Sequence, residues 1–166
     1  SASSGKANAA AIANLVAGAN IDIAGNIALD AIASGSNAGG GLAKALLTVD
    51  AGDLASIGGN ISVTANAHAA SSALANASAN IGAGSLLLLG DVTGRATAIG
   101  GRADHAFANL AMSASTGAVT VNGDIGAFAV ADAAIDAANA SIAIIANGAI
   151  TLNGADPVAS ARIGPG

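Results

Sequence analysis

The chain contains two histidines, His68 and His105, and His105 directly follows Asp104 in a glycine-rich segment. A histidine, an aspartate and one of the many serines could form the Ser-His-Asp constellation of a hydrolase. No serine lies in a Gly-x-Ser-x-Gly elbow or in another context typical of a nucleophile. We therefore expect His105 to lie in a surface loop and His68 to face solvent. We predict no catalytic residues and no enzymatic activity.

Asp91 and Asp124 each follow a glycine and are 33 residues apart. Aspartate oxygens in turns can bind Ca²⁺, which takes about six to eight oxygen ligands. This pattern offers two carboxylates, so the prediction is a solvated turn, with a bridging cation as the alternative. The glycine-rich run 35–41 is not followed by the Lys and Ser/Thr of a phosphate-binding loop, and the chain has no cysteine. No metal and no cofactor are predicted.

These two aspartates belong to a unit that recurs along the whole chain. Its clearest copy is Gly117-Ala118-Val119-Thr120-Val121-Asn122-Gly123-Asp124-Ile125, and diluted copies span 18–27, 52–61, 84–92 and 148–158. The first glycines of the units are spaced by 34, 32, 33 and 31 residues, and the second glycines by 34, 31, 33 and 31. Such a period is typical of solenoids, in which each unit buries its apolar face against its neighbours. The second glycines mark the coils: Gly25, Gly59, Gly90, Gly123 and Gly154.

The segments between the glycines alternate with a period of two residues. Apolar residues occupy every second position of 61–69, and 125–131 repeats this pattern. Alternation places one set of side chains on one face of a strand, whereas a helix has a period of 3.6. Alanine favours helices, but recurrent Gly and Asn and the shortage of long charged residues argue against a helix over 7–16. We predict an all-β fold, a β-solenoid (parallel β-helix) of about five coils with a 31–34-residue repeat.

Each coil is predicted to hold about three strands, with turns at the two glycines and a looser return. Strands are expected before the first glycines, over 44–51, 78–83, 107–115 and 140–146, and the returns 35–41 and 100–104 are expected on the surface. Strands after the second glycines taper from Ile or Val into alanine, which predicts a wedge-shaped or flattened cross-section. The predicted core stacks are Ile21, Ala55, Leu86, Val119 and Ile150; Ile23, Ile57, Leu88, Val121 and Leu152; and Ile27, Ile61, Val92, Ile125 and Val158.

The turn after the second glycine is predicted to stack four polar residues from successive coils. Asparagine ladders form hydrogen bonds from rung to rung. Two aspartates one rung apart would repel unless they were hydrated or bridged by a cation. The four residues are Asn26, Asn60, Asp91 and Asp124.

Composition limits both the core and the partners. Hydrophobic residues make up 53% of the chain, but most are alanine, and there is no Trp or Tyr, so the core must combine small side chains with backbone hydrogen bonds. The net charge of -5 and five scattered cations argue against nucleic acid and against an anionic membrane surface. The stretch 54–90 contains no Asp, Lys or Arg, but Asn60, Asn66, His68, Asn76 and several serines interrupt it, so no membrane insertion is predicted. Residues 1–166 are predicted to form one domain, frayed over 1–6, and the start at Ser1 favours a mature or excised fragment.

The Gly-x-Val-x-Val-x-Gly-Asp-Ile units and their returns rich in Ala and Asn resemble a known type of repeat. They are similar to the β-solenoid regions of large bacterial exoproteins, the filamentous-haemagglutinin-like adhesins and autotransporter passengers. This resemblance implies a secreted, extracellular or cell-surface protein with a structural or adhesive role. It carries over no catalytic residues.

Open solenoid ends leave strand edges unpaired, and no amphipathic capping helix is evident in the sequence. We therefore expect a structural building block of an extracellular fibre or surface adhesin, stacked head-to-tail with itself or with adjoining repeats of a longer chain. The alternative is a surface-binding module for ice or carbohydrate, although the threonines do not repeat in register and sugar-stacking Trp and Tyr are missing. A lyase-like enzyme would need a charged cleft, and the charges are too sparse.

Overall fold

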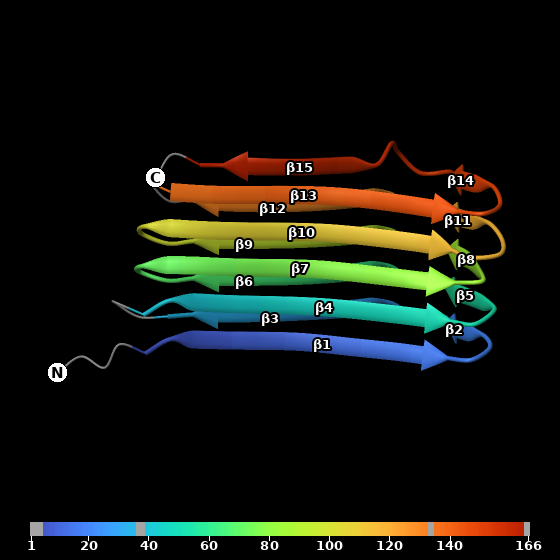
Figure 1. Cartoon of the computed structure of the whole chain (residues 1–166), viewed down its shortest axis with the longest axis horizontal. Helices are drawn as coiled ribbons and strands as arrows, with labels where there is room; N and C mark the ends of the chain where they lie inside the picture. Colours follow the sequence, from blue (N-terminus) through green and yellow to red (C-terminus); the bar gives the residue numbers. More distant parts are fainter. Residues whose placement is uncertain (1–4, 36–38, 133–134, 165–166) are drawn as a thin grey trace.

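The structure, a computed structural model, describes residues 5–35, 39–132 and 135–164, with Ala103 and Ile135 described only in their backbone. The described residues form strands β1 to β15, which assemble into three five-stranded parallel sheets. Each coil contributes one strand to each sheet, so the coils stack as rungs (Figure 1). The predicted all-β solenoid of about five coils is confirmed.

The three sheets differ in strand length. Sheet A holds the long first strand of each coil: β1 (Ala7–Ala17), β4 (Gly41–Ala51), β7 (Ser72–Ala83), β10 (Ala103–Ala114) and β13 (Ile135–Ala146). Sheet B holds the short second strands: β2 (Ile21–Ile23), β5 (Leu54–Ile57), β8 (Ser85–Leu88), β11 (Val119–Val121) and β14 (Ile150–Leu152). Sheet C holds the third strands: β3 (Ile27–Ser34), β6 (Ile61–His68), β9 (Val92–Ile99), β12 (Ile125–Asp132) and β15 (Val158–Ile163).

The register between neighbouring strands preserves the sequence repeat. Paired residues are separated by 31 to 34 positions in all three sheets, from Ala7 opposite Gly41 in sheet A to Ile125 opposite Val92 in sheet C. Both aliphatic stacks predicted for sheet B are confirmed in full: one runs from Ile21 to Ile150 and the other from Ile23 to Leu152. Stacking identical positions explains why a repeat of nearly constant length builds a regular core.

The third predicted stack is wrong in its last member. Ile27, Ile61, Val92 and Ile125 pair in succession, but Val158 pairs with Gly126 rather than with Ile125 and is 49% exposed. Counting back one residue places Pro157 opposite Ile125. Because proline has no N–H to donate to the ladder, the strand begins only after it. The last coil thus has one extra residue between β14 and β15.

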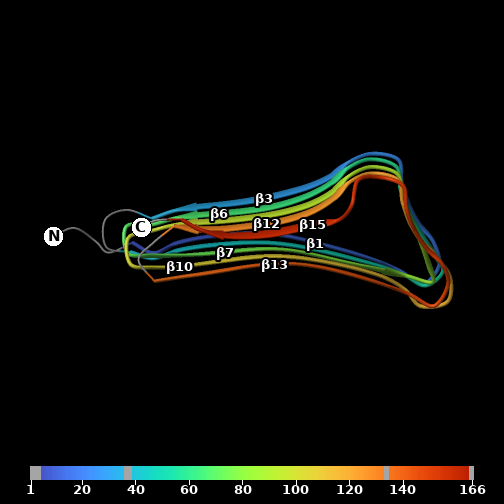
Figure 2. The same cartoon turned by 90° about the horizontal axis from the view of Figure 1, so that it is seen from above.

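The cross-section is a wedge. Sheets A and C lie close together at the end that holds the return loops and diverge toward sheet B (Figure 2). Alanines such as Ala45, Ala77 and Ala108 fill the narrow part and are fully buried, whereas Leu47 and Leu110 fill the part nearer sheet B. A methyl group allows the two sheets to approach closely, so the taper predicted from the sequence has a direct steric cause.

A single copy extends further along its strands than along the axis on which its coils stack. Five rungs spaced by about 4.8 Å give a stack of roughly 24 Å, while a 12-residue strand spans about 40 Å. The longest axis of the molecule accordingly lies along the strands (Figure 1). A rod elongated along the stacking axis would require more coils than the five described here.

Glycine is required at the corner between sheets B and C because successive coils approach closely there. A Cβ atom placed on Gly90 would lie 2.6 Å from the carbonyl carbon of Gly59, and one on Gly123 would lie 2.3 Å from that of Gly90. Contacts this short do not occur in folded proteins, so alanine at either position would force two coils apart.

The strands of sheet A begin earlier than predicted. They start at Gly41, Ser72, Ala103 and Ile135 instead of 44, 78, 107 and 140. The added residues are mostly Ala, Asn, Ser and Asp, which have weak strand preference, so the local pattern does not reveal them. Gly41 of the predicted loop 35–41 therefore belongs to a strand, while 36–38 of that loop and 1–4 of the frayed segment 1–6 lie outside the described residues.

Candidate functional site: the polar ladder and the end coils

A ladder of side-chain oxygens runs along the corner between sheets B and C. The Oδ1 atom of each member accepts a hydrogen bond from a backbone N–H one coil further on. These bonds join Asn26 to the N–H of Asn60 (2.8 Å), Asn60 to that of Asp91 (2.9 Å), Asp91 to that of Asp124 (2.9 Å) and Asp124 to that of Ala155 (2.7 Å). Ala155 has no side-chain oxygen, so the ladder ends there.

This ladder accounts for the mixture of asparagine and aspartate at one position. Both residues offer the same Oδ1 acceptor, and Asp91 and Asp124 are exposed, so their charges are hydrated. The predicted rung-to-rung bonding is present, but its donors are backbone N–H groups of the next coil. Within 5–35, 39–132 and 135–164, no three His, Cys, Asp or Glu side chains lie close enough together to hold one metal ion.

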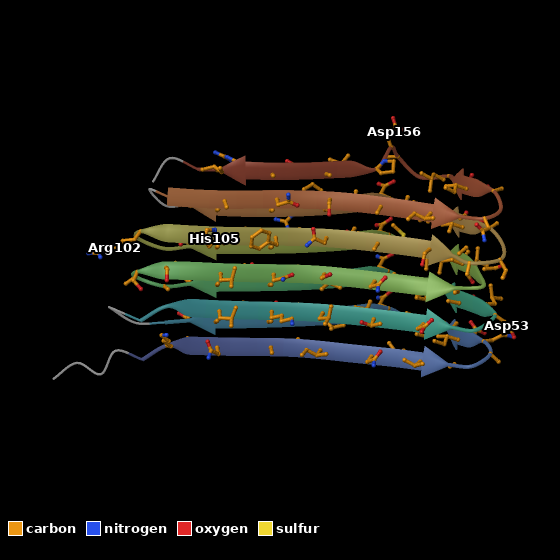
Figure 3. All side chains as sticks on the ribbon, viewed as in Figure 1. Asp53, Arg102, His105 and Asp156 are labelled. Atoms are coloured by element: carbon orange, nitrogen blue, oxygen red, sulfur yellow. The ribbon has the colours of Figure 1, made fainter. Side chains whose placement is uncertain are left out.

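The neighbours Asp104 and His105 point to opposite sides of β10. His105 is exposed (Figure 3), but it lies within β10, so the prediction of a surface loop is wrong for this residue. Its ring stacks on that of Phe107 with 6.3 Å between the centroids. Asp104 is fully buried, and its Oδ1 accepts a hydrogen bond of 3.0 Å from the N–H of Ala73. The two residues therefore do not form the His-Asp half of a catalytic triad. His68 is exposed, as predicted.

The expectation that 100–104 is entirely a surface loop is wrong for Asp104. Strand β10 already begins at Ala103, and the inward positions of this strand alternate from Asp104 onward. Its register partner in β13 is Asp136, which is half-buried, so two carboxylates follow one another on adjacent rungs. The sequence signal was available: Asp104 lies 31 residues after Ala73 and 32 before Asp136.

Three open depressions mark the outer surface. One, of about 500 Å³, lies on sheet A beside the return loops, where Lys6, Leu42, Leu74 and His105 line it. A second of about 420 Å³ lies on sheet C around Ile32. The third, about 290 Å³, borders the aspartate end of the ladder, and its lining includes Asp91, Asp124, Phe128 and Asp156.

Phe128 and Arg95 form one contact on the outer face of sheet C. The Arg95 guanidinium carbon lies 5.6 Å from the centroid of the Phe128 ring, within the range of a cation–π interaction. The same ring covers Gly126, because a Cβ there would lie 2.5 Å from the ring. This pair stabilises the sheet surface.

The threonines do not form a regular array. Thr120 and Thr151 are register partners in sheet B, whereas Thr64 lies between Asp30 and Arg95, and Thr97 pairs with Asn66. A flat ice-binding face requires the same hydroxyl-bearing residue on successive rungs. The described threonines give one such pair.

The two end coils leave apolar columns uncovered. In the fifth coil Ile150 is 48% and Leu152 is 37% exposed, although Val119 and Val121 directly below them are fully buried. In the first coil Ile23 is half-buried, while its partner Ile57 is fully buried. Asp156 projects from the corner before β15 at the C-terminal end of the stack (Figure 3). An additional coil at either end would bury these columns.

Comparison of the chain with protein-family models, with curated proteins and with solved structures gave no match. Across the described ranges, no helix is long and apolar enough to span a bilayer.

Proposed function

We propose that this chain is a structural building block of an extracellular fibre or cell-surface adhesin. Its solenoid is continued head-to-tail by a second copy or by adjoining repeats of a longer chain. The observation that carries this proposal is a register that runs unbroken through three sheets and stops at two uncovered end coils. The resemblance to the repeats of bacterial exoproteins supports secretion and a location outside the cell or on its surface.

The physical reason is that both end coils present unpaired backbone groups. The outermost strands are β1 and β13 in sheet A, β2 and β14 in sheet B, and β3 and β15 in sheet C. Such edges are templates for pairing with another strand. Pairing one end with the other displaces each added copy along the stacking axis, so the assembly does not close into a ring and produces a filament.

Negative-stain electron microscopy of the purified chain at several concentrations tests this function. We expect uniform filaments about 40 Å wide, set by the strand length, with strands perpendicular to the filament axis. Fibre diffraction from aligned filaments should show a meridional spacing of about 4.8 Å. Particles that stay single at every concentration would contradict self-assembly into a fibre.

A further inference from the structure

We propose that the first coil is shaped to receive the fifth coil of a second copy, in the register that already joins coils within the chain. This inference rests on the proposed function and adds the partner, the direction and the contacts of the junction. Two independent observations support it. Two glycines of the first coil have no neighbouring atoms at their Cβ sites, unlike the equivalent glycines of later coils, and the two ends of the stack carry complementary charges.

The corner glycines supply the first observation. Gly59, Gly90, Gly123 and Gly154 each lie so close to the coil before them that a Cβ would come within 2.3 to 2.6 Å of a backbone carbonyl carbon. Gly25 occupies the same position in the first coil and has nothing within 4 Å of its Cβ site. Glycine at this position therefore serves no contact within one copy.

Gly18 shows the same behaviour at the corner between sheets A and B. A Cβ on Gly52 would lie 2.2 Å from the carbonyl oxygen of Gly18, and one on Gly148 would lie 2.8 Å from that of Gly117. Nothing lies within 4 Å of the Cβ site of Gly18. The first coil thus keeps both clearances that a coil beneath it would require.

Charges on sheet C supply the second observation. Asp30 belongs to the outward column that ends at Ser160, and Arg162 is the next outward residue of β15. Continuing the register places Asp30 of one copy beside Ser160 of the other. One rung of about 4.8 Å and two residues of about 3.3 Å then separate the Cα atoms of Asp30 and Arg162 by about 8 Å. An arginine side chain reaches a carboxylate over this distance.

Sheets A and B bring no like charges together at this junction. Asp136 lies in the column that begins with Ala7, so the continued register sets Asp136 of one copy against Ala7 of the next. Ala7 is uncharged, and Lys6 before it lines the outer surface of sheet A, whereas Asp136 shares the inward column of Asp104. Asp22 meets Thr151 in sheet B, so the described residues bring no like charges together. Head-to-head contact would instead gather Asp22 and Asp30 of both copies at one junction.

Alanine at Gly25 tests the clearance. The Gly25 backbone is outside the left-handed region, so we expect Gly25→Ala to keep the thermal midpoint of the single copy. The critical concentration for filaments, measured by sedimentation, should rise at least about tenfold because the added Cβ forces the incoming coil away. Ser78→Ala, on the outer face of β7, is the control and should leave assembly unchanged.

Charge reversal tests the direction and the partner. Asp30→Arg and Arg162→Asp should each raise the critical concentration about five- to tenfold, because an attraction becomes a repulsion. The double variant Asp30→Arg/Arg162→Asp, and an equimolar mixture of the two single variants, should return to within about threefold of the parent. Asp50→Arg and Arg102→Asp carry the same charge changes away from both ends and serve as controls.

The outcomes separate the junction from the fibre function. Filaments that form equally well with Gly25→Ala and with both single reversals would overturn this junction while leaving the fibre function intact. A parent chain that never assembles would overturn both. Loss of assembly in the single reversals without recovery in the double variant and the mixture would overturn the assigned register. Circular dichroism of each variant confirms that its strands are retained.

Discussion

Replacing Leu88 with alanine tests the direction in which side chains point in sheet B. Leu88 is 1% exposed at the centre of the aliphatic stack that runs from Ile23 to Leu152. The substitution removes about three carbon groups, worth roughly 0.8 kcal/mol each in transfer free energy. Coils above and below hold the stack in place, so a cavity remains and increases the cost. We expect the free energy of unfolding to fall by about 3 kcal/mol.

The assay is urea unfolding followed by far-UV circular dichroism, because the chain has no Trp or Tyr for fluorescence. With a denaturant dependence of about 2 kcal/mol per M for a chain of this size, the midpoint should fall by roughly 1.5 M. The measurement is made below the concentration at which filaments form, so that assembly does not stabilise the folded state.

Two variants serve as matched controls. Leu89→Ala changes the adjacent residue, which points outward and is 45% exposed, and should cost less than about 0.5 kcal/mol. Leu152→Ala changes the same stack in the end coil, where exposure is 37%, and should cost about 1 to 1.5 kcal/mol. If Leu89→Ala destabilised the chain as much as Leu88→Ala, the assignment of inward and outward positions at the end of β8 would be refuted.

Three further substitutions test the features that hold adjacent coils together. Asn60→Ala removes one ladder acceptor and should lower the unfolding free energy by about 1 kcal/mol, whereas Asn60→Asp keeps the oxygen and should be nearly neutral; chemical denaturation distinguishes them. Asp104→Ala leaves the N–H of Ala73 without its acceptor and should cost about 1 to 3 kcal/mol, while Asp104→Asn retains an acceptor and should cost less; equal losses would contradict the role of this bond. Gly123→Ala forces a Cβ against the next coil and should cost about 3 kcal/mol by thermal unfolding, and an unchanged midpoint would show that the coils can separate freely.

Because of the repeat, the core residues of this protein could be predicted from the sequence. Each coil must place its aliphatic residues over those of the coil before it, so equal spacing in the chain becomes equal position in space. For that reason, the stack from Ile21 to Ile150 and the stack from Ile23 to Leu152 are predicted correctly. The ladder position from Asn26 to Asp124 follows from the same periodicity.

Structural features outside the strongly repeated segments could not be predicted from the spacing of the repeat. The early starts of the sheet A strands consist of residues with weak strand preference, and they become strands because neighbouring rungs supply hydrogen-bond partners. The same effect buries Asp104, whose glycine-rich surroundings are typical of a loop. The slip at Val158 arises from one added residue before a proline, a change that keeps the sequence pattern but shifts the register.

The sequence by itself determined the solenoid, its period and the inward positions of its aliphatic columns. Apolar alternation determines which residues of a strand face inward, and constant spacing determines which residues of successive coils stack on one another. Only the tertiary structure decided which atoms join the coils: side-chain oxygens bonded to backbone N–H groups, glycines in close contact, and a carboxylate buried against Ala73. These contacts form between residues more than 30 positions apart, where their distances depend on the packing of whole coils. For the same reason, only the stacked structure shows that the clearances at Gly18 and Gly25 are unused within a single copy.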